Sequence, residues 1–246
     1  MFARLIEFVL PSIIGLMVHK FETLTKKEHS AQDAFVSKLN IAKRKTEKPV
    51  IVAFIGLIGS GKSSVAKELA SQIGATVIEG DDIRIELRKQ DERYERARAI
   101  AENVAIEVVK QGGNVILDSD FIDRNKRASL REKARNAGIR LVFVCTYCDI
   151  DVTAGRIISA QYRNEIDDFF GGASSKWTGD EQSKGAVVKL REMTRRLPLH
   201  YRWENKGGGQ WTIKNPPCTV LVDIDTTDPV QWKREAKELA EKLLNK

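Results

Sequence analysis

The chain has 246 residues, of which 42% are apolar and 30% are charged, a composition typical of a globular domain with insertions. Lys and Arg number 41 against 34 Asp and Glu, a balance compatible with nucleic acid, an anionic membrane or a nucleotide as partner. The three cysteines, Cys145, Cys148 and Cys218, are too few for a disulfide framework and fit a reducing compartment. Cys145 and Cys148 lack two further ligands nearby, which argues against a zinc site.

The first 48 residues are predicted to form a helical appendage that ends in a basic linker before Pro49. Residues 8–18 are uncharged but too few to span a bilayer, which takes about 20 apolar residues. Glu7 and the lack of a small-residue cleavage pattern argue against a secretion signal. We therefore expect a cytoplasmic protein, with contact of residues 1–20 with a membrane surface as the lesser alternative.

From residue 50 onward, patterns typical of strands and helices alternate. Apolar, largely β-branched strands are predicted over residues 50–55, 76–78, 115–117, 141–145 and 219–224. Helices are predicted over residues 62–73, 93–110, 124–137, 152–166 and 227–244. This alternation indicates an α/β fold of three layers, α/β/α, around a five-stranded parallel sheet.

Residues from about 160 to 218 do not follow this alternation. They contain two glycine clusters, three of the four tryptophans and many charges, and they are too many for a plain connection. We therefore predict one domain over residues 49–246 with a lid or substrate-side insertion at about 160–218.

The sequence GLIGSGKSS follows the first predicted strand and fits the phosphate-loop pattern G-x-x-x-x-G-K-[ST]. Gly56 and Gly61 let the backbone wrap closely around an anion, and the next helix presents its positive end to it. Lys62 supplies a charge for the outer phosphates, and the Ser63 hydroxyl is placed to ligate Mg²⁺. The fold is therefore predicted to be a P-loop NTPase. The predicted ATP-binding residues are Gly56, Leu57, Ile58, Gly59, Ser60, Gly61, Lys62, Ser63 and Ser64.

The third predicted strand ends in Asp118, the arrangement of a Walker B carboxylate. We predict that Asp118 and Ser63 hold Mg²⁺. Asp120, two residues further on, could share this task or contact the substrate.

The second predicted strand runs into the sequence EGDDIR, which contains Asp81 and Arg84. Ligands of open α/β sheets bind at the carboxyl ends of strands, where a carboxylate can accept a proton from an attacking hydroxyl. Arg84 can hold an anionic part of the acceptor or the phosphoryl oxygens. A GTPase is disfavoured, because the sequence Asn-Lys-Arg-Ala at residues 125–128 lacks the aspartate of a guanine-reading motif.

Together these residues resemble the P-loop kinase superfamily of adenylate-kinase-like topology, in the branch of polynucleotide kinases, adenylylsulfate kinases, zeta-toxin-like kinases and many predicted kinases. EGDDIR is similar to the Asp-x-x-Arg that several of these families carry after the second strand. The resemblance covers roughly residues 49–160 and 218–245. It implies that Asp81 orients the acceptor hydroxyl as a base, that Arg84 clamps the acceptor or a phosphate, and that Arg127 lies near the acceptor.

These kinases also close an arginine-bearing lid over the triphosphate. Arg156 and Arg163 lie seven residues apart, on one face of the helix predicted over residues 152–166, and are predicted to neutralise charge on the transferred phosphoryl group. A second basic group in the insertion could bind an anionic acceptor. It consists of Arg191, Arg195 and Arg196.

The sequence thus predicts an ATP- and Mg²⁺-dependent phosphotransferase that acts on a hydroxyl of a small molecule or a nucleotide-like acceptor. One variant is a polynucleotide 5′-hydroxyl kinase, in which Trp177, Trp203 and Trp211 could stack bases, although they could equally be the core of the insertion. Another variant is a toxin-like nucleotide-sugar kinase. The alternative of another class is an ATP-binding switch or adaptor that transfers no phosphate.

Overall fold

The structure, a computed structural model, describes residues 23–162, 176 and 178–245. Three features of the sequence lie outside the described residues. They are the uncharged run 8–18, Arg163 and Trp177.

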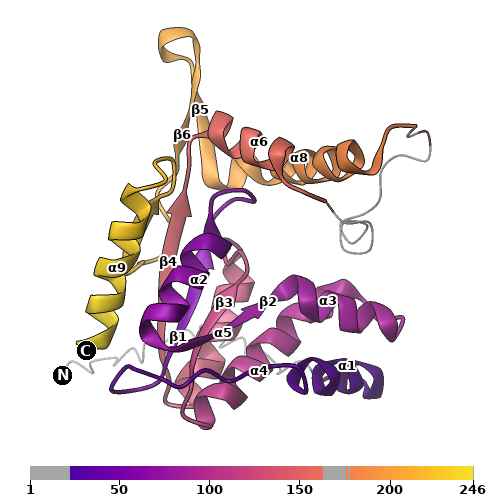
Figure 1. The fold of residues 1–246 in the computed structure, drawn as a ribbon, viewed down its shortest axis with the longest axis vertical. Helices are drawn as coiled ribbons and strands as arrows, with labels where there is room; N and C mark the ends of the chain where they lie inside the picture. Colours follow the sequence, from indigo (N-terminus) through magenta and orange to yellow (C-terminus); the bar gives the residue numbers. More distant parts are fainter. Residues whose placement is uncertain (1–22, 163–175, 177, 246) are drawn as a thin grey trace, which may run out of the picture.

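A five-stranded parallel sheet forms the centre of the molecule (Figure 1). In spatial order its strands are β2 (Ala75–Glu79), β3 (Asn114–Asp118), β1 (Val50–Ile55), β4 (Arg140–Tyr147) and β7 (Val222–Asp225). All four neighbouring pairs are parallel, so the predicted sheet is confirmed. The order places β1 beside β3, and β3 beside β2. The loops that follow these strands therefore meet at one edge of the sheet, where ligands of such folds bind.

Helices cover both faces of this sheet (Figure 1). Every residue of β1 is buried, and its alternate residues enter two separate apolar clusters, as expected for a strand covered on both sides. One face is covered by α2 (Lys62–Ile73) and α9 (Gln231–Leu244). The other face is covered by α1 (Lys26–Val36), α3 (Gly80–Lys89), α4 (Ala97–Lys110) and α5 (Arg124–Asn136).

The predicted bounds of β1 and α2 match the structure to the residue, whereas other elements differ at their ends. The 93–110 helix is a short 3₁₀ turn, Tyr94–Arg96, followed by α4. Helix α6 (Ile150–Ser159) ends seven residues before the predicted 166, because Ala160 adopts an extended backbone. Helix α9 starts at Gln231, after the Asp228 side chain has accepted hydrogen bonds from the backbone of Val230 and Gln231.

Helix α1 was predicted only as part of an appendage, and the structure packs it into the main body. Thr25 and Glu28 form a capping box at its start. Ala31 and Phe35 lie in the same buried cluster as residues of β1 and β3. That residues 1–48 form a separate unit stays a prediction, and this packing weighs against it. Among the described residues, no helix is long and apolar enough to cross a membrane.

Within the described residues, the insertion contains helix α8 (Glu181–His200) and a two-stranded hairpin that projects from the body (Figure 1). The hairpin strands are β5 (Tyr201–Glu204) and β6 (Gln210–Ile213). Helix α8 packs against α6, where its Met193 and Leu197 share a cluster with Ile157 and with Leu57 of the phosphate loop. The insertion is thus joined to the loop by apolar contacts.

Candidate active site

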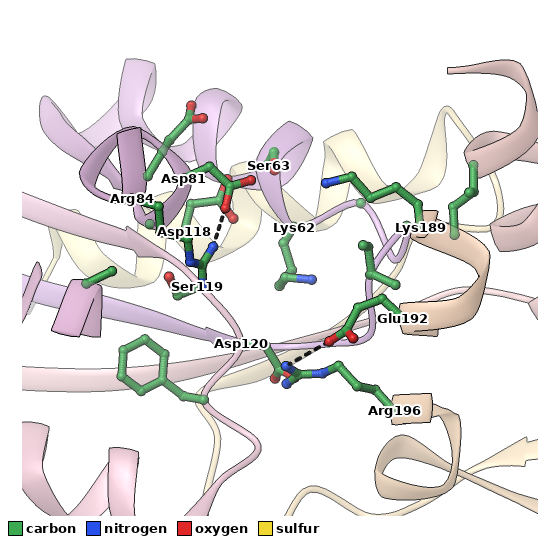
Figure 2. A pocket seen from close by; sticks show the side chains of 18 of the residues that line it. Lys62, Ser63, Asp81, Arg84, Asp118, Ser119, Asp120, Lys189, Glu192 and Arg196 are labelled. Atoms are coloured by element: carbon green, nitrogen blue, oxygen red, sulfur yellow. Dashed lines mark hydrogen bonds and ion pairs between the residues drawn. The ribbon is translucent and has the colours of Figure 1, made fainter. Parts of the chain in front are cut away.

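A cavity of about 510 Å³ opens at the carboxyl ends of β1, β2 and β3 (Figure 2). This volume is in the usual range of small-molecule sites. Its walls come from the phosphate loop, the start of α3, the segment after β3, α4, α6 and α8. The motifs that the sequence places far apart therefore face one space.

The phosphate loop is held tightly by its neighbours. A Cβ at Gly56 would lie only 2.4 Å from Oγ1 and 2.7 Å from the carbonyl oxygen of Thr146, so no other residue fits there. Gly61 has φ of 80°, which favours glycine, and α2 begins at the next residue. The Nζ of Lys62 donates hydrogen bonds to the carbonyl oxygens of Gly56 and Leu57. Burial lowers the pKa of Lys62, while nearby carboxylates oppose this shift.

Six of the nine predicted ATP-binding residues line the cavity, and three lie beneath it. The six are Ile58, Gly59, Gly61, Lys62, Ser63 and Ser64. Gly56 lies beneath the cavity with Leu57 and Ser60, whose side chains point into the protein. Leu57 is 1% exposed, and Ser60 Oγ lies 3.0 Å from Thr146 Oγ1. These three residues can act on a phosphate only through their backbone or by fixing the loop.

Ser63 and Asp118, the predicted metal ligands, line the same cavity (Figure 2). A hydroxyl and a carboxylate suit Mg²⁺, which is usually held by one or two carboxylates with water and substrate phosphates. Within the described part of the chain, no group of three or more His, Cys, Asp or Glu side chains could hold a metal. The donor set fits an ion that a bound nucleotide helps to hold.

Asp81 and Arg84 lie beside Asp118, in the first turns of α3, and form an ion pair (Figure 2). Helix α3 was not predicted; Ile83 and Leu87 bury its inner face in the core. Gly80 allows the close approach of this helix, since a Cβ there would lie 2.9 Å from Ser119 Oγ after β3. Asp82, the neighbouring carboxylate, belongs to a different groove near Phe35.

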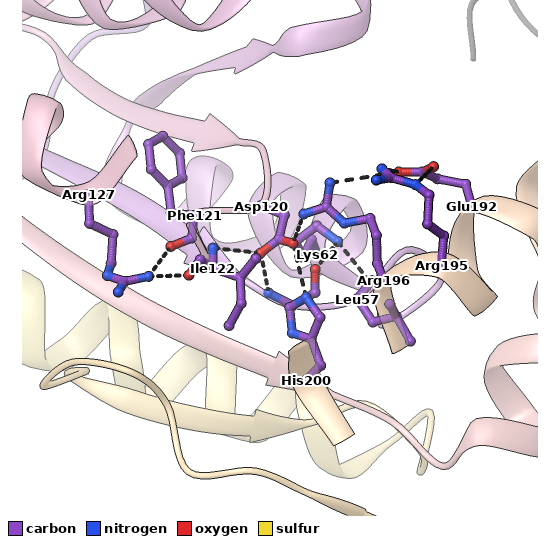
Figure 3. Close-up of polar contacts among 11 residues, drawn as sticks. Leu57, Lys62, Asp120, Phe121, Ile122, Arg127, Glu192, Arg195, Arg196 and His200 are labelled. Atoms are coloured by element: carbon purple, nitrogen blue, oxygen red, sulfur yellow. Dashed lines mark hydrogen bonds and ion pairs between the residues drawn. The ribbon is translucent and has the colours of Figure 1, made fainter. Parts of the chain in front are cut away.

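Asp120 also lines the cavity, but protein donors use both of its oxygens (Figure 3). Oδ1 accepts the backbone N–H groups of Gly56 at 3.2 Å and Ile122 at 3.0 Å. Oδ2 pairs with Arg196 and with His200 Nε2 at 3.0 Å. Burial alone would raise the pKa of Asp120, but the cationic and hydrogen-bonding neighbours lower it well below the usual range. The expectation that Asp120 shares the metal or contacts the substrate does not fit this saturated carboxylate.

Arg127 does not line the cavity. It is buried, and its guanidinium donates to the carbonyl oxygens of Phe121 and Ile122 (Figure 3). That Arg127 lies near the acceptor, as the resemblance implies, stays a prediction. In the structure Arg127 fixes the segment that carries Phe121 into the cavity wall.

Of the two expected lid arginines, only Arg156 lies within the described residues. Arg156 lines the cavity and donates to Thr226, whose Oγ1 in turn donates to the carbonyl oxygen of Ser60 in the phosphate loop. Arg163 lies outside the described residues. Of the second basic group, Arg196 lines the cavity, whereas Arg195 is exposed and pairs with Glu192.

Several cavity residues were not predicted from the sequence. Lys126 is one, and burial lowers its pKa, with Arg196 and Arg84 adding to the effect. The others include Ala97, Arg98, Ala101, Phe121, Lys189 and Glu192. The spacing of Lys189, Glu192 and Arg196 along α8 is the one signal that could have found part of this set, because residues three to four apart share a helix face.

Three features surround this one cavity: a phosphate loop, a carboxylate at the end of the neighbouring strand, and a carboxylate–arginine pair. Together they define a P-loop phosphotransferase. Comparison with known proteins agrees. A family model described as an AAA domain matches residues 51–169. The adenylyl-sulfate kinase of Bacillus velezensis is 30% identical over 167 residues, which cover 63% of this chain and 83% of that protein. The enzyme of the same name from Bacillus pumilus is 31% identical over 158 residues, 59% of this chain and 79% of that protein.

The chain therefore belongs to the P-loop kinases, in the family that contains the adenylyl-sulfate kinases, and the predicted resemblance is confirmed. Such kinases bind ATP and transfer phosphate to an alcohol group. Solved structures show the same fold. A protein from Chloroflexus aurantiacus has a TM-score of 0.54 at 15% identity, covering 80% of this chain and 100% of that one. The APS kinase of Mycobacterium tuberculosis, solved with AMPPNP and APS, has a TM-score of 0.51 at 20% identity, covering 81% and 99%.

Proposed function

We propose that this kinase transfers the γ-phosphate of ATP to a hydroxyl of a small, anionic, nucleotide-like acceptor in the cytoplasm. The observation that carries the proposal is the single cavity shared by two sets of residues. Lys62 and Ser63 of the phosphate loop line it, and Asp81 and Arg84 at the start of α3 line it as well (Figure 2).

On the donor side, the backbone of the phosphate loop and the start of α2 would bind the triphosphate. Lys62 would leave the carbonyl oxygens of Gly56 and Leu57 and contact the outer phosphates, where its charge is better satisfied. Ser63 and Asp118 would hold Mg²⁺, which neutralises charge on the phosphates when it is bound.

On the acceptor side, Asp81 would accept the proton of the attacking hydroxyl. The new bond joins the acceptor oxygen to the γ-phosphorus, the bond from this phosphorus to the bridging oxygen breaks, and ADP leaves with that oxygen. Arg84, already paired with Asp81, would hold the carboxylate in place.

The lining of the cavity indicates the class of acceptor. Arg84 and Lys126 are basic residues from two different helices, and a molecule bound near them should carry negative charge. The lining also includes a buried apolar wall suited to a flat, apolar group such as a base. This wall consists of Ala97, Ala101 and Phe121. Adenylyl sulfate, named in the two bacterial relatives, combines both features and is the first acceptor to test.

A polynucleotide acceptor has less support. Trp203 and Trp211 lie on the projecting hairpin and pack edge to face with ring centroids 5.3 Å apart. Neither is among the residues that line the cavity.

The test is transfer of label from γ-labelled ATP to three acceptors: adenylyl sulfate, a neutral sugar, and a DNA oligonucleotide with a free 5′-hydroxyl. Mg²⁺-dependent transfer to adenylyl sulfate alone supports the proposal. Transfer only to the oligonucleotide or the neutral sugar would overturn the acceptor class. Tight ATP binding without transfer to any acceptor in a wide screen would favour a nucleotide-dependent switch.

A further inference from the structure

Helix α8 of the insertion turns one charged face toward the cavity. Lys189, Glu192 and Arg196 line the cavity at spacings of three and four residues, and His200 follows one turn later on the same face (Figures 2 and 3). The adjoining face carries Met193 and Leu197 into the apolar cluster with α6. The packing of α8 therefore fixes which of its side chains reach the site.

Arg196 joins this face of α8 to Asp120, the carboxylate that contacts the phosphate loop. Its side chain is 22% exposed and pairs with Asp120, while Glu192 lies 3.8 Å away. By contrast, Arg195 is 69% exposed and does not line the cavity.

The carboxylate of Asp120 connects the phosphate loop to helix α8 (Figure 3). One oxygen accepts the N–H of Gly56, the first residue of the phosphate loop, and the other holds Arg196 and His200 of α8. The side chains of His200 and Asp120 are 6% and 10% exposed, so the carboxylate is largely sheltered from water. The sheltered link sets the position of Arg196 relative to the loop.

We infer, building on the proposed function, that Arg196 is a catalytic residue that contacts the γ-phosphoryl group, and that Asp120 and His200 are positioning residues that hold it there. A guanidinium suits this task because it stays charged and presents several N–H donors in a rigid plane. Arg196 takes no proton in the transfer. It donates hydrogen bonds to the phosphoryl oxygens while the proton of the acceptor goes to Asp81.

The alternative is that the pair between Arg196 and Asp120 only fastens the insertion to the body. The two roles differ in what happens to nucleotide affinity. An arginine on the γ-phosphate favours ATP over ADP, whereas a fastening pair affects both nucleotides equally.

The experiment is calorimetric titration of Mg·ATP and of Mg·ADP into the full chain, comparing wild type, Arg196→Gln and the matched control Arg195→Gln. We expect Arg196→Gln to lower the preference for ATP over ADP about tenfold, with ADP affinity within about twofold of wild type, as the loss of one charge-assisted hydrogen bond implies. Arg195→Gln should match wild type. An unchanged preference in Arg196→Gln, or an equal loss for both nucleotides, would overturn the inference.

Two further variants keep the test decisive. Arg196→Lys retains a positive charge and should fold even if Arg196→Gln does not. We expect Arg196→Lys to lower the preference for ATP over ADP about threefold. A wild-type preference in Arg196→Lys would contradict the inference. Asp120→Asn should reproduce the loss, and the double variant with Arg196→Gln should lose no more than either single change, because both act through one contact. Additive losses would reject the positioning role. Since no acceptor is present, these outcomes are independent of whether the wild type transfers phosphate to a given acceptor.

Discussion

Lys62 closes the phosphate loop on itself, with its Nζ 2.9 Å from the carbonyl oxygen of Gly56. The carbonyl oxygen of Leu57, at 2.8 Å, completes the arrangement. Two neutral acceptors satisfy an ammonium group less well than phosphate oxygens do, because hydrogen bonds between ions are the stronger kind. A bound triphosphate would therefore give the ammonium group of Lys62 stronger hydrogen bonds than these two carbonyl oxygens do.

This arrangement predicts that Lys62→Ala weakens Mg·ATP binding by about ten- to a hundredfold, since a hydrogen bond to a charged group contributes about 1.5–3 kcal/mol. The matched control is Lys67→Ala in the same helix, where the Lys67 side chain is 69% exposed and its nearest partner is Glu79 at 3.8 Å. Calorimetry should find wild-type affinity in the control. Unchanged affinity in Lys62→Ala would remove Lys62 from the site.

The local parts of this fold could be predicted from the sequence, because their signals lie within a few residues of one another. Strand β1, the phosphate loop and α2 form one continuous pattern, and their bounds are correct. Helix α3 was missed because its first turn is rich in charge, which hides the apolar pair Ile83 and Leu87.

The non-local parts of the site could not be predicted in this way. Asp120 and Arg196 are 76 residues apart in the chain, and only the packing of α8 brings them together. The side-chain direction of Arg127 could not be predicted for a related reason. A resemblance gives the position of a residue in the chain, whereas the direction of its side chain depends on the turn after β3, which points this guanidinium at the backbone of Phe121 and Ile122.

The two adjacent carboxylates of α3 offer a sharp test of the acceptor side. Asp81→Asn should lower kcat by about a hundred- to ten-thousandfold, the range of general-base catalysis, and leave ATP affinity within about twofold. Asp82→Asn is the control, since Asp82 lies in the groove beside Phe35 and does not line the cavity. Steady-state kinetics with the acceptor found in the transfer screen provides the measurement. Equal activity of both variants would exclude Asp81 as the base.

Helix α1 should contribute to the stability of the whole domain. Phe35 is 6% exposed within the cluster that also contains residues of β1, β3 and α4, so Phe35→Ala should lower the free energy of unfolding by about 3–5 kcal/mol. Val230→Ala, at a position that is 76% exposed, should change it by less than about 0.5 kcal/mol. Urea denaturation measures both. A loss below about 1 kcal/mol for Phe35→Ala would support the view of residues 1–48 as a detachable appendage.

The carboxylate of Asp120 predicts how stability depends on pH. Its pKa lies below the ordinary value of 3.8 in the folded chain, so the folded state holds the proton less tightly than the unfolded state does. The resulting stabilisation is fully present above about pH 4 and is lost as the pH falls toward the folded pKa. Lowering the pH from 6 to 3 should reduce the free energy of unfolding by about 1 kcal/mol through the protonation of this one carboxylate in the unfolded state.

Urea denaturation of wild type and Asp120→Asn at these two pH values measures the effect. The wild type should lose about 1 kcal/mol more than the variant, because the amide of the variant does not titrate. Asp33→Asn, an exposed position on α1, should keep the wild-type dependence. The same change of unfolding free energy with pH in wild type and Asp120→Asn would contradict the prediction. The link between the phosphate loop and α8 would then not depend on an ionised Asp120, and Arg196 would have to be held by its other contacts.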